Sequence, residues 1–193
     1  MLAVENQIMD TLTLDALNDA SPEQALGMLD GLYEHSPWIA EQALAARPFA
    51  SVEQLRRCMV EVLARAPEHA QLALIRAHPE LAGKAMVAQT LTSESTSDQQ
   101  AAGLTACSPE EFARIQELNA AYNARFGFPF ILCVGQGSNM DRAGIIARFA
   151  RRLENTPADE RAQALHQINR IVSFRLAAKF GLPYPDADNV LSA

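Results

Sequence analysis

The chain has 193 residues, of which 49% are hydrophobic, and a formal net charge of −7 at pH 7. Its length and apolar content suffice for one domain with a sizeable core. The acidic balance argues against a nucleic-acid partner, because phosphate binding needs a clustered basic surface and the sequence shows none. No apolar run reaches the roughly eighteen residues of a membrane span, and the N-terminus lacks a signal-peptide pattern, so no membrane contact and a cytoplasmic location are expected.

Helix-start patterns recur along the chain, each with a hydroxyl residue that can cap a helix and an acid or amide three positions later that can reach back. They begin at Ser21, Ser51, Ser108 and Thr156, and three of them carry proline at the first helical position. Apolar residues then follow the last two at steps of three and four. The sequence therefore predicts an all-α fold, a single compact domain of about eight to ten helices.

This domain is expected to cover the whole chain, residues 1–193, because no internal linker or repeat interrupts it. Only the termini, about 1–14 and 184–193, look loosely attached. The three cysteines, Cys58, Cys107 and Cys133, are odd in number and show no CxxC spacing. They are expected to be free thiols in a reducing compartment.

His78 stands directly before Pro79 in the segment Arg76 to Lys84. Proline disfavours helical φ/ψ at the residue before it and suits the first helical position, so the pattern predicts a helix that begins at Pro79. The positive end of that helix would keep the imidazole neutral near pH 7, where it can act as an acid or base. A histidine that merely caps a helix or is satisfied in the core is the alternative.

A polar block follows at residues 95–104 and predicts a helix with the Asp98 carboxylate in its first turn. The same residues read as a capping box, worth about 1 kcal/mol, so a structural and a binding role can coexist. The groups that suit a ligand rich in carbonyl and amide edges belong to Ser95, Thr96, Ser97, Asp98 and Gln99.

Residues 126–137 are the one stretch without a helical pattern, being aromatic and β-branched with glycine and proline between. A buried extended segment or loop is expected there. Gly135-Gln136-Gly137 lacks the third glycine of a dinucleotide loop, because Met140 stands in its place. His35, His69 and His166 have no metal-ligand spacing, so neither a nucleotide cofactor nor a metal is predicted.

Arg175 lies on the last predicted helix, about 20° around the axis from Ile168 and near the middle of its apolar face. A buried guanidinium without a partner is very costly. Two partners are open: an internal carboxylate, or an oxygen-rich anionic ligand.

Four motifs in order, covering roughly residues 22–180, resemble the 2-oxo-4-hydroxy-4-carboxy-5-ureidoimidazoline (OHCU) decarboxylases of uric acid degradation. They are His78–Gly83, Ser95–Leu104, Phe126–Phe130 and Ile171–Leu176. The chain departs from the family pattern at Asp98, where the family has glutamate. The resemblance implies loss of CO₂ from OHCU and stereospecific protonation to (S)-allantoin (purine metabolism), without metal or organic cofactor, by a homodimer. Apolar residues near the N-terminus add some support for the dimer: Leu2, Ile8, Met9, Leu12 and Leu14.

The resemblance also implies the site. His78 and Asp98 are the expected catalytic pair, with their division of roles left open, and the remaining residues are expected to bind substrate in a pocket large enough for a bicyclic-sized ligand. These are Pro79, Ser95, Thr96, Ser97, Gln99, Phe130, Ile131, Leu132, Cys133, Val134, Gly135 and Arg175. Two alternatives remain: an all-α interaction module without catalysis, and another acid/base enzyme acting on a small cyclic amide.

Overall fold

The computed structural model describes residues 11–83, 92–101, 103–134 and 140–185; within the helices, the side chains of residues 98, 99, 101 and 105 are not part of this description. These ranges contain nine α-helices, the short 3₁₀ helix η1, and no strand, which confirms the all-α prediction. The α-helices are α1 (Leu14–Asp19), α2 (Pro22–Met28), α3 (Trp38–Leu44), α4 (Val52–Arg65), α5 (Glu68–Ala77), α7 (Ser93–Ala101), α8 (Pro109–Phe126), α9 (Arg142–Arg152) and α10 (Pro157–Lys179); η1 spans Leu104–Ala106.

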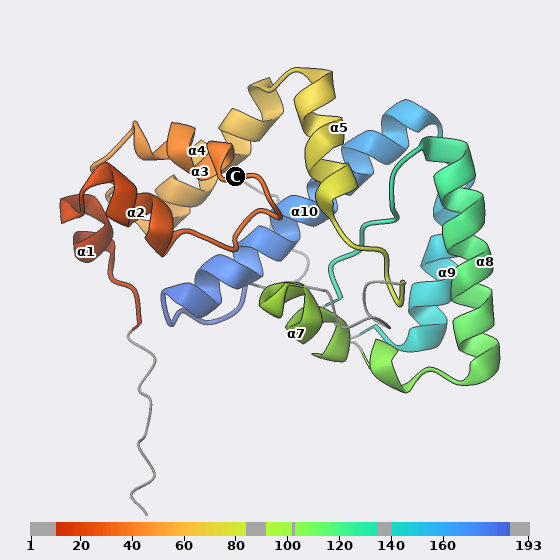
Figure 1. The fold of residues 1–193 in the computed structure, drawn as a ribbon. Helices are drawn as coiled ribbons and strands as arrows, with labels where there is room; N and C mark the ends of the chain where they lie inside the picture. Colours follow the sequence, from red (N-terminus) through yellow and green to blue (C-terminus); the bar gives the residue numbers. More distant parts are fainter. Residues whose placement is uncertain (1–10, 84–91, 102, 135–139, 186–193) are drawn as a thin grey trace, which may run out of the picture.

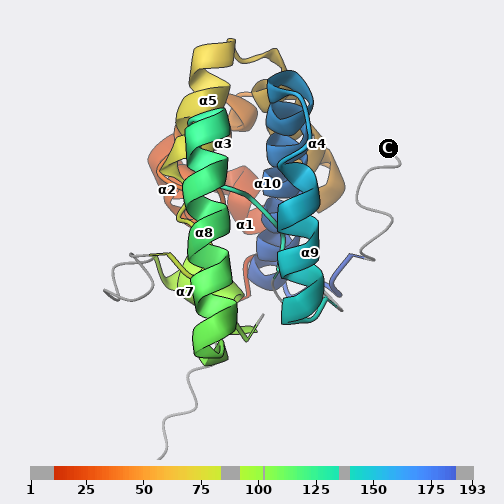
Figure 2. The same ribbon diagram turned by 90° about the vertical axis from the view of Figure 1, so that its right-hand side faces the viewer.

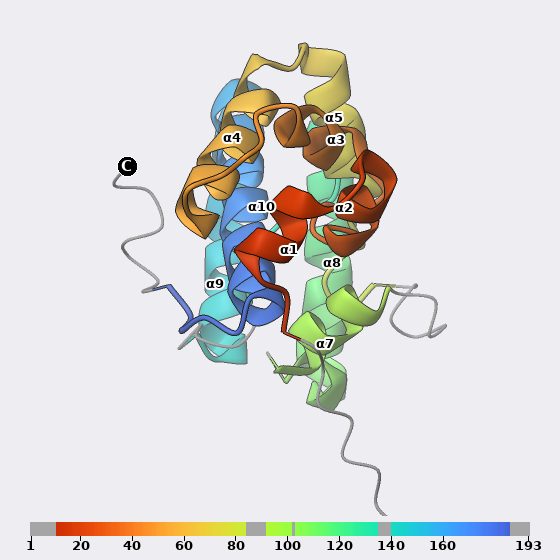
Figure 3. The ribbon, with the colours of Figure 1, turned by 90° about the vertical axis from the view of Figure 1, so that its left-hand side faces the viewer.

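The longest helix, α10, runs through the middle of the molecule and packs against α4 and α5. Helices α1 to α4 gather around its C-terminal half, and α8 and α9 lie at its N-terminal end (Figure 1). Figure 2 shows α8 and α9 side by side, and Figure 3 shows the face that α1 and α2 cover. No helix of the described ranges is long and apolar enough to cross a membrane.

All four predicted helix starts are confirmed by their caps. The hydroxyls of Ser21, Ser51, Ser108 and Thr156 each accept the backbone N–H three residues on, at the starts of α2, α4, α8 and α10. The periodic apolar residues behind them face the core: Ile115, Leu118, Tyr122, Ile168, Val172 and Leu176 are all buried. Local capping chemistry and helical period thus decide where these elements begin and which side they bury.

A buried non-helical segment also follows α8, as predicted. Helix α8 ends at Gly127, whose φ of 72° lies in the left-handed region that glycine adopts without strain. Residues 128–134 then run between α5 and α9 (Figure 1) and are buried throughout. This segment is therefore part of the interior of the protein.

Two local predictions are wrong. His78 is the C-cap of α5 rather than the start of a helix, and residues 79–83 are non-helical, with a turn at Leu81 and Ala82. Helix α7 begins at Ser93, so Asp98 lies in its middle. Proline ends the preceding helix as effectively as it begins a following one, and sequence position alone does not separate the two cases.

Two residues of the N-terminal stretch 11–14, which was predicted to be loosely attached, contact the rest of the chain. The Leu12 N–H donates to the Lys179 carbonyl over 3.0 Å, and Leu12 and Leu14 pack against the chain's own core. Leu2, Ile8 and Met9, and the C-terminal residues 186–193, lie outside the described residues. The single domain over 1–193 stays a prediction.

Candidate active site

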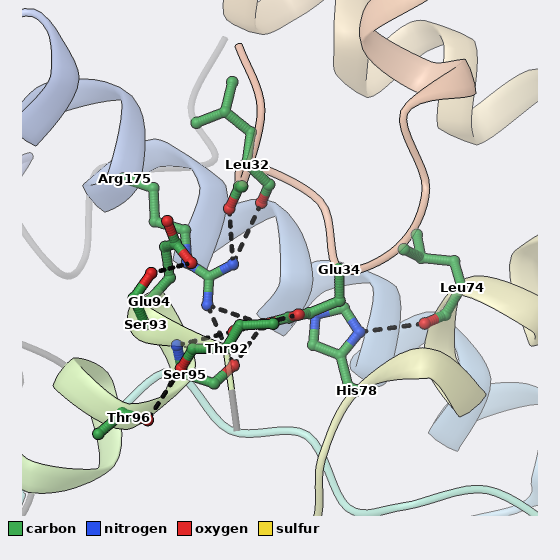
Figure 4. A network of polar contacts seen from close by, with 11 residues as sticks. Leu32, Glu34, Leu74, His78, Thr92, Ser93, Glu94, Ser95, Thr96 and Arg175 are labelled. Carbon is green, nitrogen blue, oxygen red and sulfur yellow. Dashed lines mark hydrogen bonds and ion pairs between the residues drawn. The ribbon is translucent and has the colours of Figure 1, made fainter. Parts of the chain in front are cut away.

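His78 is held at the end of α5 by a hydrogen bond within its own turn. Its Nδ1 lies 3.0 Å from the Leu74 carbonyl oxygen, and the side chain is buried. Because a carbonyl oxygen only accepts, Nδ1 carries the proton, and the neutral ring has its lone pair at Nε2. In Figure 4 the second ring nitrogen lies on the side away from Leu74, toward Glu34.

The predicted neutral state of His78 agrees with its surroundings, for a different reason. Burial lowers the pKa of His78 to about 4, against smaller raising effects of the Leu74 hydrogen bond and the Glu34 charge. Arg175 and His35 lower this pKa further. Desolvation, rather than a helix N-terminus, therefore keeps the imidazole uncharged near pH 7.

Side-chain amides from α8 fix the turn that follows His78. Asn119 donates to the Leu81 carbonyl oxygen over 3.0 Å, and Gln116 donates to that of Ala82 over 2.8 Å. Ala82 has a φ of 47°, an unfavourable value for a residue with a side chain. The hydrogen bonds to α8 stabilise this turn and so hold the chain after His78.

Arg175, on α10, is buried in a network with Glu34 and Ser95 (Figure 4). Its Nη2 lies 3.2 Å from Glu34 Oε1 and 3.5 Å from Ser95 Oγ, and its Nη1 donates to the Gly31 carbonyl oxygen over 3.0 Å. Of the two partners left open by the sequence, the internal carboxylate is present as Glu34. Arg175 also lines a cavity, where an anionic ligand could reach it.

Glu34 is the functional candidate that the sequence did not reveal. Burial alone would raise its pKa, but hydrogen bonding from Ser95 and the charge of Arg175 outweigh this effect and lower the pKa below its usual value. Thr92 Oγ1 adds a hydrogen bond of 3.1 Å. Glu34 is thus a buried anion near pH 7, and the only signal for it in the sequence was that Arg175 needed a partner.

Ser95 does not cap α7, contrary to the predicted capping box. Thr92, the residue before the helix, accepts the Ser95 N–H over 3.2 Å. Because Thr92 takes the capping role, the Ser95 hydroxyl is available to Glu34, to which it donates a short hydrogen bond. Ser95 therefore belongs to the polar network.

His78, Ser95 and Arg175 border one cavity between α5, α7, α10 and the non-helical segment. Its lining comprises His78, Pro79, Leu81, Ser95, Phe130, Ile131, Leu132, Val134, Ile171 and Arg175. The structure thus brings His78 and Arg175, far apart in sequence, to the same small space. The cavity holds about 40 Å³, room for water but not for a ring-sized ligand, so the predicted size of the pocket is wrong in this state.

Three residues predicted to bind substrate are not among those that line this cavity. The Thr96 hydroxyl donates to the Thr92 carbonyl oxygen within the helix, and Ser97 is exposed. The Cys133 N–H donates to Gln167 Oε1 over 3.0 Å. The side chains of Asp98 and Gln99, and all of Gly135, lie outside the described residues, so their roles stay predictions.

No three histidine, cysteine, aspartate or glutamate side chains gather closely enough to hold a metal ion in the part of the chain that the structure describes. Cys58, Cys107 and Cys133 all fall within that part and form no disulfide.

Comparison with known proteins identifies the family. The family model of OHCU decarboxylases matches residues 18–177, a span that includes every side chain of the network. The chain belongs to the OHCU decarboxylase family. Membership confirms the predicted enzyme class, a decarboxylase (carboxy-lyase), and argues against an interaction module without catalysis.

Relatives support this assignment over most of this chain. An OHCU decarboxylase of Haloferax volcanii is 36% identical, covering 89% of this chain and 98% of the relative. The Bacillus subtilis uric acid degradation bifunctional protein PucL is 39% identical, but the match covers 86% of this chain and only 32% of that protein. Sequences similar to this chain thus occur both as separate chains and as parts of larger ones.

Solved structures agree with the fold. A crystal structure of (S)-allantoin synthase has a TM-score of 0.65 at 29% identity, with 87% of this chain and 54% of that one aligned. A crystal structure of OHCU decarboxylase in the presence of (S)-allantoin has a TM-score of 0.62 at 19% identity, with 84% and 99% aligned. The latter similarity concerns the fold alone.

Proposed function

We propose that this protein decarboxylates OHCU to (S)-allantoin, without a cofactor, in the cavity bordered by His78, Ser95 and Arg175. The observation that carries this proposal is the juxtaposition of a neutral, buried imidazole with a buried guanidinium at one cavity, in a chain of the OHCU decarboxylase family. Because the cavity is narrow, substrate binding must widen it.

His78 is proposed to act first as a base and then as an acid. With Nδ1–H fixed on Leu74, Nε2 has the lone pair that accepts a proton from the substrate hydroxyl. The carbon–carboxylate bond then breaks, and the ring C=N and carbonyl system takes up the electron pair. The imidazolium is strongly acidic because its pKa is lowered to about 4, so it readily returns the proton to the carbanion from one face. A second proton, taken up from solvent, completes neutral allantoin, because the departing CO₂ leaves the negative charge of the carboxylate on the ring.

Arg175 is proposed to stabilise negative charge on the substrate ring. A donor aimed at ring oxygens or nitrogens acts where charge accumulates in the transition state, whereas a tight grip on the carboxylate would only stabilise the ground state. Backbone N–H groups of the segment 131–135 are proposed to assist, except for the Cys133 N–H, which Gln167 occupies. Asp98 and Gln99 are proposed to orient the ureido arm or the imidazole.

No cofactor is needed for this reaction, because the conjugated ring of the substrate is itself the electron acceptor. The proposal therefore requires the protein to supply only proton transfer, hydrogen-bond donors and exclusion of water.

The test is to incubate the protein with freshly generated OHCU and follow the optical activity of the product. Accelerated loss of OHCU with formation of optically active (S)-allantoin is expected. Racemic allantoin formed at the spontaneous rate would reject the proposed function, and turnover of a different cyclic amide would favour the other acid/base enzyme.

A homodimer in the cytoplasm is also proposed. The high apolar fraction supports the dimer, although Leu12 and Leu14 are satisfied within their own chain. Three cysteines without a disulfide suit a reducing compartment. Sedimentation at micromolar concentration should show a dimer, and only monomer would contradict it.

A further inference from the structure

Glu34 is buried in a stretch of chain whose conformation is unusual. It lies between α2 and α3 and is only 3% exposed. Gly31 before it has a φ of 78°, and His35 after it has a φ of 46°, which is uncommon for a residue with a side chain. The backbone here adopts an unfavourable conformation, and the resulting turn directs Glu34 toward Arg175 and Ser95 (Figure 4).

The Glu34 carboxylate joins two helices that border the cavity. It is ion-paired with Arg175 on α10 over 3.2 Å and accepts hydrogen bonds from the hydroxyls of Ser95 and Thr92 at the start of α7. Thr92 Oγ1 also accepts the Ser95 N–H over 3.2 Å. The first turn of α7 and the guanidinium of α10 are therefore fixed by the same anion.

We infer that Glu34 is a positioning residue for the reaction, which holds Arg175 and Ser95 in one arrangement and sets the position of α7 beside the cavity. This inference rests on the proposed function. Glu34 itself is not needed as a proton carrier, since its ion pair and hydroxyl partners favour its charged form. Its effect on catalysis passes through the guanidinium and through the helix that carries Asp98.

The first experiment is a double-mutant cycle with Glu34→Gln and Arg175→Lys. Glutamine keeps the shape of the side chain and removes the charge, so kcat/KM for OHCU should fall by about 10-fold or more while the helical circular dichroism persists. Because part of the effect of Glu34 passes through Arg175, the loss of activity in the double variant should be smaller than the combined losses of the two single variants. Fully additive losses would overturn the inference.

Glu34→Asp supplies the conservative comparison and a second route if Glu34→Gln does not fold. It keeps the charge on a side chain one methylene shorter, so its activity should lie between those of wild type and Glu34→Gln, and its loss should also be non-additive with Arg175→Lys. Activity of Glu34→Asp below that of a folded Glu34→Gln would contradict a role based on charge.

Hydrogen exchange tests the positioning independently of turnover. Backbone amides of α7 should exchange faster in Glu34→Gln, and those of α4 should not change. The matched control is Glu61→Gln, in an exposed ion pair with Arg65 on α4, which should leave both α7 exchange and kcat/KM unchanged. If the wild-type protein does not convert OHCU, the proposed function fails, while hydrogen exchange still shows whether Glu34 positions α7. If the wild type is active and Glu34→Gln has unaltered activity and α7 exchange, the positioning role alone is rejected.

Discussion

Among the described residues, two arginine–glutamate pairs are buried, Arg152–Glu160 and Arg175–Glu34, and they are built differently. Arg152 and Glu160 have side chains only 6% and 0% exposed, and Glu160 also accepts hydrogen bonds from Tyr122 and from Asn155 over 2.6 Å. The Arg152 guanidinium packs 4.5 Å from the centre of the Phe130 ring and donates to the Ile131 carbonyl oxygen. This pair thus supports Phe130 and Ile131, two residues that line the cavity.

In the Arg175–Glu34 pair, by contrast, the arginine lines the cavity. Its ion-pair contact is longer, at 3.2 Å, and the hydroxyl groups of Ser95 and Thr92 also bind Glu34. The comparison teaches that burial of a charge pair does not define its role. A pair satisfied on all sides by fixed side chains stabilises the fold, whereas a pair at a cavity can be shared with a ligand.

The largest effect should come from Glu160→Ala, which leaves the Arg152 charge buried without this carboxylate. Removing one member of a buried pair costs about 3–5 kcal/mol of unfolding free energy, measurable by urea denaturation. The control is Glu61→Ala in the exposed Arg65 pair, expected to change stability by less than about 1 kcal/mol. Equal losses in both variants would remove the distinction between buried and exposed pairs.

The second effect concerns pH. Burial lowers the pKa of His78 from 6.5 to about 4, so between these values the unfolded chain binds a proton that the folded chain does not. Stability contributed by His78 should therefore be lost as pH falls from 6.5 toward 4. The free energy of unfolding of His78→Asn should therefore depend less steeply on pH in this window than that of wild type. Burial also lowers the pKa of His166, but this residue contributes equally in both proteins. Parallel curves would contradict the assignment.

A smaller effect is expected from Arg175→Lys. Lysine keeps the charge but loses the planar fork that bonds Glu34 and the Gly31 carbonyl together, so substrate affinity should fall by about 10-fold. Stability should change much less than in Glu160→Ala. Arg65→Lys on the surface is the control for the loss of a guanidinium. If Arg175→Lys instead unfolds, and its folded fraction has unchanged kinetics, Arg175 serves the fold in the same way as Arg152.

The smallest change is Asp98→Glu. It restores the family's usual carboxylate in the middle of α7, and activity should stay the same or rise if that group takes part in the reaction. Asp98→Asn should then be strongly impaired in kcat. Full activity of Asp98→Asn would show that the carboxylate is not needed.

The sequence predicted elements whose causes are local. Capping by Ser21, Ser51, Ser108 and Thr156 needs only neighbouring residues, and the structure confirms all four. The buried segment after α8 was equally visible, because glycine, proline and aromatic residues break the helical period. The pattern around Pro79 was ambiguous, since proline marks both the end and the start of helices.

The polar network around Arg175 could not be predicted from the sequence, because its members are far apart along the chain. The position of Arg175 on an apolar face indicated that a partner was needed, but the chain has 23 acidic residues, and Glu34 lies 141 positions away. Only the folded chain brings the two together. The same holds for Thr92, whose capping role displaced Ser95 into the network.

The central claim is that His78 moves a proton at the cavity it shares with Arg175, and single-turnover kinetics of His78→Asn test it most directly. The variant should be compared with wild type above pH 7, where protonation of the histidine no longer affects stability. The account predicts a folded protein that binds OHCU but converts it about 100-fold more slowly or worse. A folded His78→Asn variant that forms (S)-allantoin at the wild-type rate would contradict it.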